Sequence, residues 1–275
     1  MKIVSGTTEF HITEDTVMTI GKFDGFHLGH ACITDEMLSF RRRGLKTAVL
    51  TFSTPPAVVA MREDMKLLTT PVEKELIFEK IGIDYLVEFP FNEITAAISA
   101  DEFIEEYVVK RMRAKAVVVG EDCRFGHRAS GNVDVLNEYG RRLGFETRVI
   151  KKLVDEHSNK VISSTLLREL LSEGNIDEVN RLAGHPYYIE GEFSRLCDER
   201  DAVTSDISDE PGLFGCSGIY SVSVPSNKLL PPAGSYYIKH GAFDRDNVCE
   251  MLCKLDGCNG SMSHEFNNTY SLLEI

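Results

Sequence analysis

The sequence predicts an α/β fold in which helices cover a parallel sheet, and three observations favour it. Short apolar runs alternate with segments of helical periodicity through the first two-thirds of the chain. Glycine stands after several of the helical segments, where it ends helices readily. Segments rich in glycine and polar residues follow two of the apolar runs directly. Ligands of parallel sheets lie beyond the carboxyl ends of the strands, so these segments are the candidate sites.

Five strands and four helices are expected along this part of the chain. The strands are expected at Thr16–Ile20, Thr47–Phe52, Tyr85–Phe89, Ala116–Val119 and Glu146–Ile150, and the helices at Ala31–Arg43, Val72–Ile81, Ala100–Met112 and Val133–Leu143. Pro71 suits the first turn of the second helix, and Ser99 suits the N-cap of the third. Gly44, Gly82 and Gly144 then end the first, second and fourth helices. Helices placed between strands are the usual connection of parallel neighbours.

Size and composition indicate a two-domain protein without a membrane span. The chain has 275 residues, more than a single core usually holds. No run approaches the roughly 20 apolar residues that cross a bilayer, and Met1–Phe10 lacks the features of a signal peptide. Seven cysteines without a regular framework indicate reduced thiols, so we expect a cytoplasmic protein. The net charge of −13 argues against nucleic acid or an anionic membrane as a partner.

The segment Gly21–His30 has the composition of a phosphate site. It follows the first expected strand and precedes a helix that we expect to start near Leu28. Glycine allows a ligand to approach the backbone closely, and a helix N-terminus offers N–H groups and a positive dipole end to an anion. His27 and His30, on either side of Gly29, would add donors. The alternative is that both histidines are structural.

His27-Leu28-Gly29-His30 resembles the His-x-Gly-His motif of the adenylyl- and cytidylyltransferase superfamily. Two later segments narrow the resemblance: Val119–Gly126, which reads VGEDCRFG, and Ile162–Arg168, which reads ISSTLLR. With Gly21–His30 they are similar, in the same order, to the motifs of the prokaryotic bifunctional riboflavin kinase/FAD synthetase family. The similarity extends to about residue 193. It implies a Rossmann-like nucleotidyltransferase domain with a parallel sheet at 1–184 and a small, shortened β-barrel-like riboflavin kinase-type domain at 185–275.

The resemblance also implies which residues act. His27 and His30 would steady the triphosphate of ATP during attack on its α-phosphorus, and Ser164 and Arg168 would act on the β- and γ-phosphates. The implied nucleotide- or phosphate-binding positions are Gly21, Phe23, Asp24, Gly25, Gly29, Gly120, Asp122, Ser163 and Thr165. ATP, FMN and FAD are the implied small-molecule partners. Mg²⁺ would be held largely through phosphate and water, so no metal site built from side chains is expected.

Each of the two later motifs also has a structural explanation. Gly120–Gly126 fits an ordinary turn after a strand, and Ser163–Thr165 fits a helix N-cap. Arg168 would then lie on a solvated helix face opposite Glu169. The cap and the phosphate role are compatible, because a helix start that faces solvent can direct hydroxyl and N–H groups at phosphate oxygens.

Two departures from the family pattern concern the flavin side. The family continues with Pro-His-Pro after the strand that ends at Phe52, whereas Thr54–Pro56 here reads TPP, and Cys123 replaces a usual aromatic residue. The resemblance to the family therefore supports the flavin acceptor with fewer matching residues than it supports nucleotide binding. Phe23, Phe52 and Phe125 could stack on a flavin or adenine ring, although aromatic residues at strand ends more often complete a core.

The second domain lacks the kinase motifs of the family. Neither the glycine- and arginine-rich phosphate loop nor the Pro-Thr-Ala-Asn motif is present in its sequence. A carboxylate-rich segment between Asp198 and Glu210 would instead repel a triphosphate. Gly218–Val224 fits a barrel strand. We therefore expect riboflavin kinase activity to be lost, whereas the domain could still fold as a shortened barrel.

A cluster of cysteines near the end of the chain has two interpretations. Cys249, Cys253 and Cys258, with His264 beyond them, could hold zinc. Their spacing is poor for that metal, and no Cys-x-x-Cys pair is present. The commoner explanation is a short helix beginning at Asp246 whose buried face carries the first two cysteines.

The resemblance thus implies an FMN adenylyltransferase, a nucleotidyltransferase that makes FAD and pyrophosphate from ATP and FMN by in-line transfer. One alternative is adenylyl transfer to another phosphorylated small molecule. Another is a flavin- or nucleotide-binding regulator without catalysis, which would bind FMN or FAD but release no pyrophosphate. The oligomeric state, the preferred direction of reaction and flavin binding by the second domain are left open.

Overall fold

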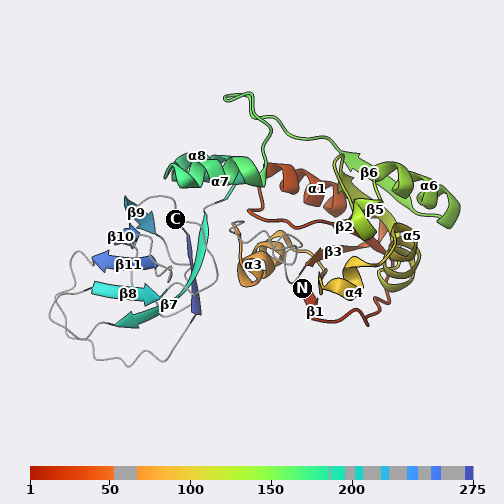
Figure 1. The fold of residues 1–275 in the computed structure, drawn as a ribbon, viewed down its shortest axis with the longest axis horizontal. Coiled ribbons are helices and arrows are strands. Elements are labelled where there is room, and N and C mark those ends of the chain that lie inside the picture. The colour runs from red at the N-terminus through yellow and green to blue at the C-terminus, as the bar shows by residue number, and fades with distance from the viewer. Residues whose placement is uncertain are drawn as a thin grey trace. The chain divides into compact units, whose positions relative to one another are not determined.

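The computed structural model describes residues 1–52, 67–185 and 187–195 and five further strands up to residue 274 (Figure 1). Within these ranges the structure describes the side chains up to Tyr187, except that of Val72. The chain forms two compact units. The first comprises Met1–Met65 and Lys74–Ile162, and the second comprises Lys66–Glu73 and Ser163–Ile275. The domain boundary after Gly184 stays a prediction.

The first unit is built on a six-stranded parallel sheet. Its strands are β1 (Lys2–Ser5), β2 (Thr16–Ile20), β3 (Lys46–Phe52), β4 (Tyr85–Phe89), β5 (Ala114–Gly120) and β6 (Glu146–Ile150), in the order β1-β4-β3-β2-β5-β6. Every neighbouring pair runs parallel. The predicted α/β class and its five predicted strands are confirmed. The sheet places the carboxyl ends of the adjacent strands β2 and β5 at one edge.

Helices connect these strands. They are α1 (Leu28–Ser39), the 3-10 turn η1 (Phe40–Arg43), α3 (Pro71–Ile81), which begins in the second unit, α4 (Glu93–Ala96), α5 (Ala100–Glu102), the π-helix η2 (Phe103–Arg111), the 3-10 turn η3 (His127–Ala129) and α6 (Val133–Leu143). The Ser99 hydroxyl caps α5 by accepting from the Glu102 N–H. Gly44, Gly82 and Gly144 follow their helices with positive φ, as predicted.

Two features of this unit differ from the sequence-based expectation. β1 was not predicted, because it has only four residues, lies at the sheet edge and leaves three of them exposed, which weakens the periodic signal. The helix expected at Ala100–Met112 is mostly π-helix. Over nine residues the apolar spacing of a π-helix resembles that of an α-helix, so periodicity does not separate them.

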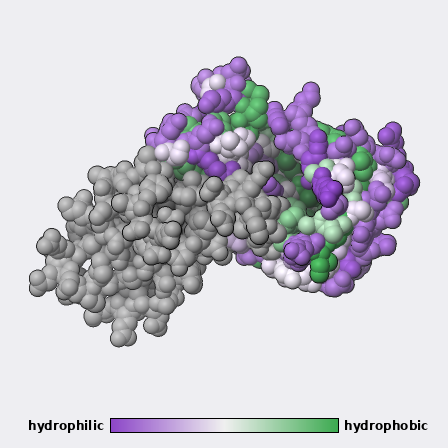
Figure 2. Space-filling model, in the orientation of Figure 1, coloured by the Kyte–Doolittle hydropathy of each residue, from purple (hydrophilic) through white to green (hydrophobic). Residues whose placement is uncertain are grey.

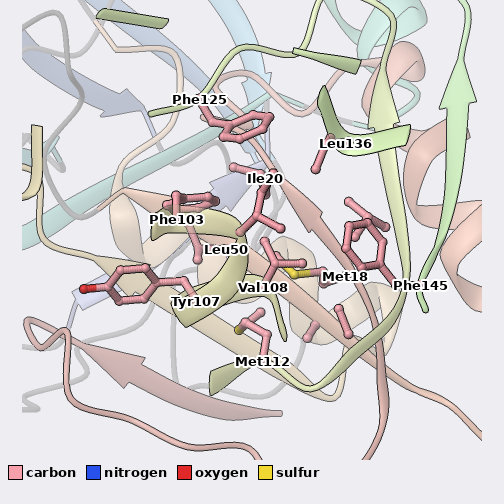
Figure 3. Packing of buried hydrophobic residues seen from close by; sticks show 14 of the residues in the cluster. Met18, Ile20, Leu50, Phe103, Tyr107, Val108, Met112, Phe125, Leu136 and Phe145 are labelled. Carbon is pink, nitrogen blue, oxygen red and sulfur yellow. The ribbon is translucent and has the colours of Figure 1, made fainter. Parts of the chain in front are cut away.

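A hydrophobic core packs against one face of the sheet (Figure 3). Met18 and Leu50 from the strands belong to the same core cluster as Tyr107 of η2 and Met112, the C-cap residue of η2, and all four are buried. Aromatic rings add edge contacts, with the centroids of Phe89 and Tyr107 4.8 Å apart. Burying each such side chain contributes about 1.5–3 kcal/mol to the stability of the fold. The core therefore stabilises the strands that carry the candidate site.

The second unit combines two helices with an antiparallel sheet. The helices are α7 (Ser164–Ser172) and α8 (Ile176–Ala183), and the strands are β7 (Tyr188–Arg195), β8 (Ala202–Asp206), β9 (Gly218–Val222), β10 (Gly234–His240), β11 (Cys249–Lys254) and β12 (Tyr270–Glu274). Their order is β12-β7-β8-β11-β10-β9. The strand expected from Gly218 is confirmed as β9, whereas closure of the sheet into a barrel stays a prediction.

The short helix expected from Asp246 is wrong. Cys249–Lys254 is the strand β11, paired antiparallel with β8 and β10. Positions four apart share a face in a strand as well as in a helix, so the cysteine spacing fits both. Cys258, His264 and most of the carboxylate-rich segment lie outside the described residues, as does Thr54–Pro56.

Among the described helices, none is both long and apolar enough to cross a membrane. On the face of the molecule that Figure 2 shows, hydrophilic residues cover most of the described surface and hydrophobic ones form smaller patches. The exposed large hydrophobic residues include Ile94 on α4 and Val154 and Val161, which face each other across an isolated bridge.

Candidate active site

The turn from β2 to α1 is tied to the neighbouring strand. All five residues of β2 are buried, and the turn begins where the Gly21 N–H donates to the carbonyl oxygen of Leu50 at 3.1 Å. The Thr51 hydroxyl then donates to the carbonyl oxygen of Lys22 at 3.2 Å. These two bonds hold the start of the predicted motif over the carboxyl end of β3.

The same turn contains backbone conformations that favour glycine. Gly25 has φ of 76°, and Phe23 adopts φ of 50° although it carries a side chain. Left-handed backbone at a residue other than glycine persists only where its surroundings hold it, and it concentrates at functional sites. The Phe23 side chain is 1% exposed, so its ring anchors the turn in the interior.

The two histidines stack at the start of α1. His27 is the N-cap residue, and its carbonyl oxygen accepts from the His30 N–H at 2.7 Å and the Ala31 N–H at 3.1 Å. The two imidazole centroids are 3.8 Å apart with ring planes 18° from parallel. A Cβ atom at Gly29 would lie 3.0 Å from both Nδ1 and Cε1 of His27. The His27 ring therefore leaves no room for a side chain at position 29, which explains the glycine there.

Burial keeps both imidazoles neutral near pH 7. It lowers the pKa of His27 to about 4, although the Asp122 carboxylate opposes the shift. Burial, and then the neighbouring His27, lower the pKa of His30 well below its ordinary value. Within the described part of the chain, the Nδ1 atoms of both rings have no hydrogen-bond partner. The pair thus offers unsatisfied polar atoms and N–H donors rather than fixed positive charge.

The loop after β5 meets this turn. Gly120 ends β5, and a Cβ atom there would lie 3.2 Å from Oδ1 of Asp122. The Asp122 carboxylate acts on the His27 ring and pairs with the Lys152 ammonium at 3.1 Å. The two motifs are far apart in the sequence, yet adjacent strands bring them to the same sheet edge.

Aromatic residues divide into core and partly exposed groups. Phe125 is buried, and its ring centroid lies 5.6 Å from that of Phe103, so it completes the core, as Phe23 does. Phe52 is only partly buried and meets Phe91, with ring centroids 5.5 Å apart. Phe91 was not singled out from the sequence. Of these rings, Phe52 and Phe91 are the partly exposed ones.

Cys123, the second departure from the family pattern, is not a reactive thiol. Burial, followed by the charge of Asp122, raises the pKa of Cys123 to about 12. A thiol with so high a pKa stays protonated at neutral pH and is a poor nucleophile.

The third motif begins a helix in the second unit. The Ser163 hydroxyl accepts from the Leu166 N–H at 3.3 Å, so the N-cap interpretation is confirmed. Thr165 is exposed, and Ser164 and Arg168 are partly buried. Their assignment to a common site with the histidines stays a prediction.

Sequence reasoning missed a buried lysine close to the first motif. Lys74 is 5% exposed, and the carboxylates of Asp24 and Glu88 act on it. Asp24 was expected at the site on other grounds. The residues next to Lys74 in the sequence are those of an ordinary exposed helix, so they do not indicate its burial. Only folding brings it near the carboxylates.

Comparison with known proteins identifies the family. The model of the FAD synthetase family matches residues 9–166, which contain the first two motifs and most of the third. A bifunctional riboflavin kinase/FMN adenylyltransferase of Listeria monocytogenes is 33% identical over 85% of this chain and 70% of its own length. An FAD synthetase of the same organism is 31% identical over 76% of this chain and 86% of its own length.

A solved structure confirms the fold. The crystal structure of a protein described as a macrolide-efflux protein from Streptococcus pneumoniae matches 99% of this chain and 88% of that one, with a TM-score of 0.81 and 20% identity. At that identity the likeness concerns the fold alone. The fold, the motif geometry and the family match agree, and the chain belongs to the FAD synthetase family.

Proposed function

We propose that the protein is an FMN adenylyltransferase that makes FAD and pyrophosphate from ATP and FMN. The observation that carries the proposal is the buried, stacked pair of His27 and His30 at the N-terminus of α1. The pair lies at the carboxyl edge of a parallel sheet, inside the segment that matches the FAD synthetase model. Helix N-termini at this edge are suited to bind phosphate.

The reaction needs no nucleophile from the protein. A phosphate oxygen of FMN attacks the α-phosphorus of ATP, a new phosphorus–oxygen bond forms, and the bond to the oxygen that bridges to the β-phosphate breaks. Pyrophosphate carries away that electron pair. The protein then has to align the two phosphates and stabilise the charge that develops on the leaving group.

The histidines supply that stabilisation as hydrogen-bond donors. Neutral imidazole carries one N–H, which would be directed at a phosphate oxygen, and the start of α1 adds backbone N–H groups and its dipole. A bound polyphosphate would also raise the pKa of both rings, because an anion favours the imidazolium form. The two imidazoles would thus gain partial positive charge when ATP binds.

The leaving phosphates are assigned to the third motif. We infer that Ser164 and Thr165 at the start of α7 bind the β- and γ-phosphates, with Arg168 one turn along. The guanidinium offers a planar fork of donors that suits phosphate. Asp24 and Asp122 have supporting roles around the nucleotide, together with Gly21, Gly25, Gly29 and Gly120.

Magnesium enters as part of the Mg-ATP substrate. Over the part of the chain that the structure describes, no three carboxylate, histidine or cysteine side chains gather into a metal site. Mg²⁺ typically keeps several waters and binds through substrate phosphates, which suits such a site. We also infer a cytoplasmic location, where ATP is supplied and where thiols such as the free Cys32 and Cys123 stay reduced.

Riboflavin would not be a substrate. The family's phosphate loop and Pro-Thr-Ala-Asn motif are missing, and carboxylates stand between Asp198 and Glu210 in their place.

The test is product analysis by chromatography. Purified protein is incubated with Mg-ATP and FMN, and separately with Mg-ATP and riboflavin. We expect FAD and pyrophosphate in equal amounts from FMN, and no FMN or FAD from riboflavin. Tight FMN binding without pyrophosphate release would instead indicate a regulator. Conversion of riboflavin at a rate comparable to FAD formation would contradict the loss of kinase activity.

A further inference from the structure

Three charged side chains are buried together next to the β2–α1 turn. Asp24 in the turn, Lys74 on α3 and Glu88 on β4 are 6%, 5% and 4% exposed. Lysine and carboxylate side chains are almost never buried to this extent unless they are paired. All three belong to the first compact unit, and the proposed reaction assigns no role to Lys74 or Glu88.

The packing of α3 directs Lys74 toward Asp24. Lys74 and Phe78 are four residues apart and so share a helix face. The ring centroid of Phe78 lies 5.3 Å from that of Phe23 and 5.5 Å from that of Phe26, in edge-to-face contacts. These two rings flank Asp24 in the sequence. The face of α3 that carries Lys74 is therefore the face packed on the turn.

Glu88 approaches the lysine from the sheet. Val87 and Phe89 point into the core on one side of β4, so Glu88, between them, points to the other side. In the sheet register Glu88 is opposite Thr51, whose hydroxyl holds the turn at Lys22. The turn, α3 and β4 thus each contribute one charged group to this cluster.

The charges of the cluster depend on one another. Burial lowers the pKa of Lys74, and the Asp24 and then the Glu88 carboxylates raise it. Without the ammonium, both buried carboxylates would lose the attraction of a nearby positive charge. The lysine therefore favours the burial of Asp24 under the turn.

Ring contacts connect this cluster to the histidines. The centroid of His30 lies 5.0 Å from that of Phe23 and 6.1 Å from that of Phe26. His30 in turn stacks on His27. A change in the position of the turn would therefore move both imidazole rings.

We propose that Lys74 is a positioning residue: its buried side chain, on the face of α3 that packs on the Phe23–Phe26 turn, holds the turn in place through its attraction to the Asp24 carboxylate, and so sets the two imidazole rings for the triphosphate. The effect on catalysis rests on the proposed function, whereas the effect on the rings does not. Misplacement of reacting groups by about 1 Å can cost on the order of a hundredfold in rate, so the lysine influences turnover without touching substrate.

The test compares Lys74→Met with Lys80→Met, a matched change at an exposed position on the same helix. Turnover is measured together with NMR spectra of histidine-labelled protein, in which His27→Gln and His30→Gln variants assign the two signals among the eight histidines. We expect Lys74→Met to shift both signals and to lower kcat about tenfold to a hundredfold, with KM for FMN within about twofold. Lys74→Arg should recover part of kcat, and Lys80→Met should change neither readout.

Two outcomes would overturn the proposal. One is a folded Lys74→Met protein with unchanged histidine signals and wild-type kcat. If that variant does not fold, the Phe78→Leu variant is measured instead. This change loosens the contact between α3 and the Phe23–Phe26 turn and leaves the charges in place. It should shift the His30 signal, and an unmoved signal overturns the proposal. Should the wild type make no FAD at all, the proposed function fails, and the histidine signals still test the position of Lys74.

Discussion

The starts of α1 and α7 differ in how their N-termini are satisfied, although both carry motif residues of one family. At α7 the Ser163 hydroxyl caps the helix by accepting from the Leu166 N–H. At α1 the N-cap is His27, and among the described residues its side chain makes no capping bond. Its ring stacks on His30 instead. The N-cap side chain of α7 is therefore bonded to its own helix, whereas the N-cap side chain of α1 is not.

This difference predicts where variants act. A capped helix start loses stability when the cap is removed, typically about 1 kcal/mol. An uncapped start that carries neutral buried histidines loses little stability by substitution, because the native protein already leaves their polar atoms unpaired. Variants in α1 should therefore change the rate, whereas a variant at the α7 cap should mainly change stability.

The largest effect is expected at the histidines. His27→Ala and His30→Ala should each lower kcat by roughly 10²–10³, since each removes a donor to the developing charge, worth about 2–4 kcal/mol. The fold should stay intact by circular dichroism. His157→Ala, at an exposed position, is the control. If both alanine variants turn over FMN and ATP at near-normal rates, the histidines are not the catalytic donors.

Acid should destabilise the protein through the same residues. The pKa of His27 is lowered from 6.5 to about 4 in the folded state, so between these values the unfolded chain binds a proton that the folded chain does not. The free energy of unfolding therefore rises with pH across this window and falls as pH drops through it. The difference amounts to about 3 kcal/mol.

The measurement is urea unfolding by circular dichroism at several values between pH 4 and pH 7. Wild type should lose about 3 kcal/mol more than His27→Gln over this range, and the difference isolates His27 from the carboxylates that also titrate. Parallel pH dependences in the two proteins would mean that burial does not keep this imidazole neutral.

A smaller effect is expected from Arg168→Lys on α7. Lysine keeps the charge but loses the planar fork, so KM for ATP should rise about tenfold, or ~1.4 kcal/mol, while KM for FMN stays the same. Steady-state kinetics with each substrate varied in turn separates the two. An altered dependence on FMN with an unchanged dependence on ATP would place the arginine on the flavin side.

The smallest effect is expected at the α7 cap. Ser163→Ala should lower the free energy of unfolding by about 1 kcal/mol, and Ser163→Asn, which can still accept from the helix, should cost less. Both should keep kcat within a few-fold of wild type. A loss of kcat in Ser163→Ala far beyond its loss of stability would show that this hydroxyl contacts phosphate as well as capping the helix.

Much of the fold could be predicted because its signals are local. The strands from Thr16 to Ile150 and the glycines that end the helices follow from periodicity and backbone freedom. β1 escaped prediction because it is a short, exposed edge strand, and β11 was expected as a helix because cysteines four apart suit either element. Local patterns do not decide such elements, because tertiary pairing forms them.

The candidate site divides in the same way. His27, His30 and Asp122 were identified from motifs, and adjacent strands bring their loops to one edge. The neutral state of the histidines and the burial of Lys74 could not be predicted, since both depend on what surrounds the side chain after folding. Burial and pairing are properties of the packed chain.

The central claim is that the protein transfers an adenylyl group to FMN. It is tested most directly by following the label from ATP that carries radioactive phosphorus at either the α or the γ position. We predict that α-label appears in FAD, one equivalent for each FMN consumed, and that γ-label appears in pyrophosphate. No transfer of α-label to FMN would contradict the account.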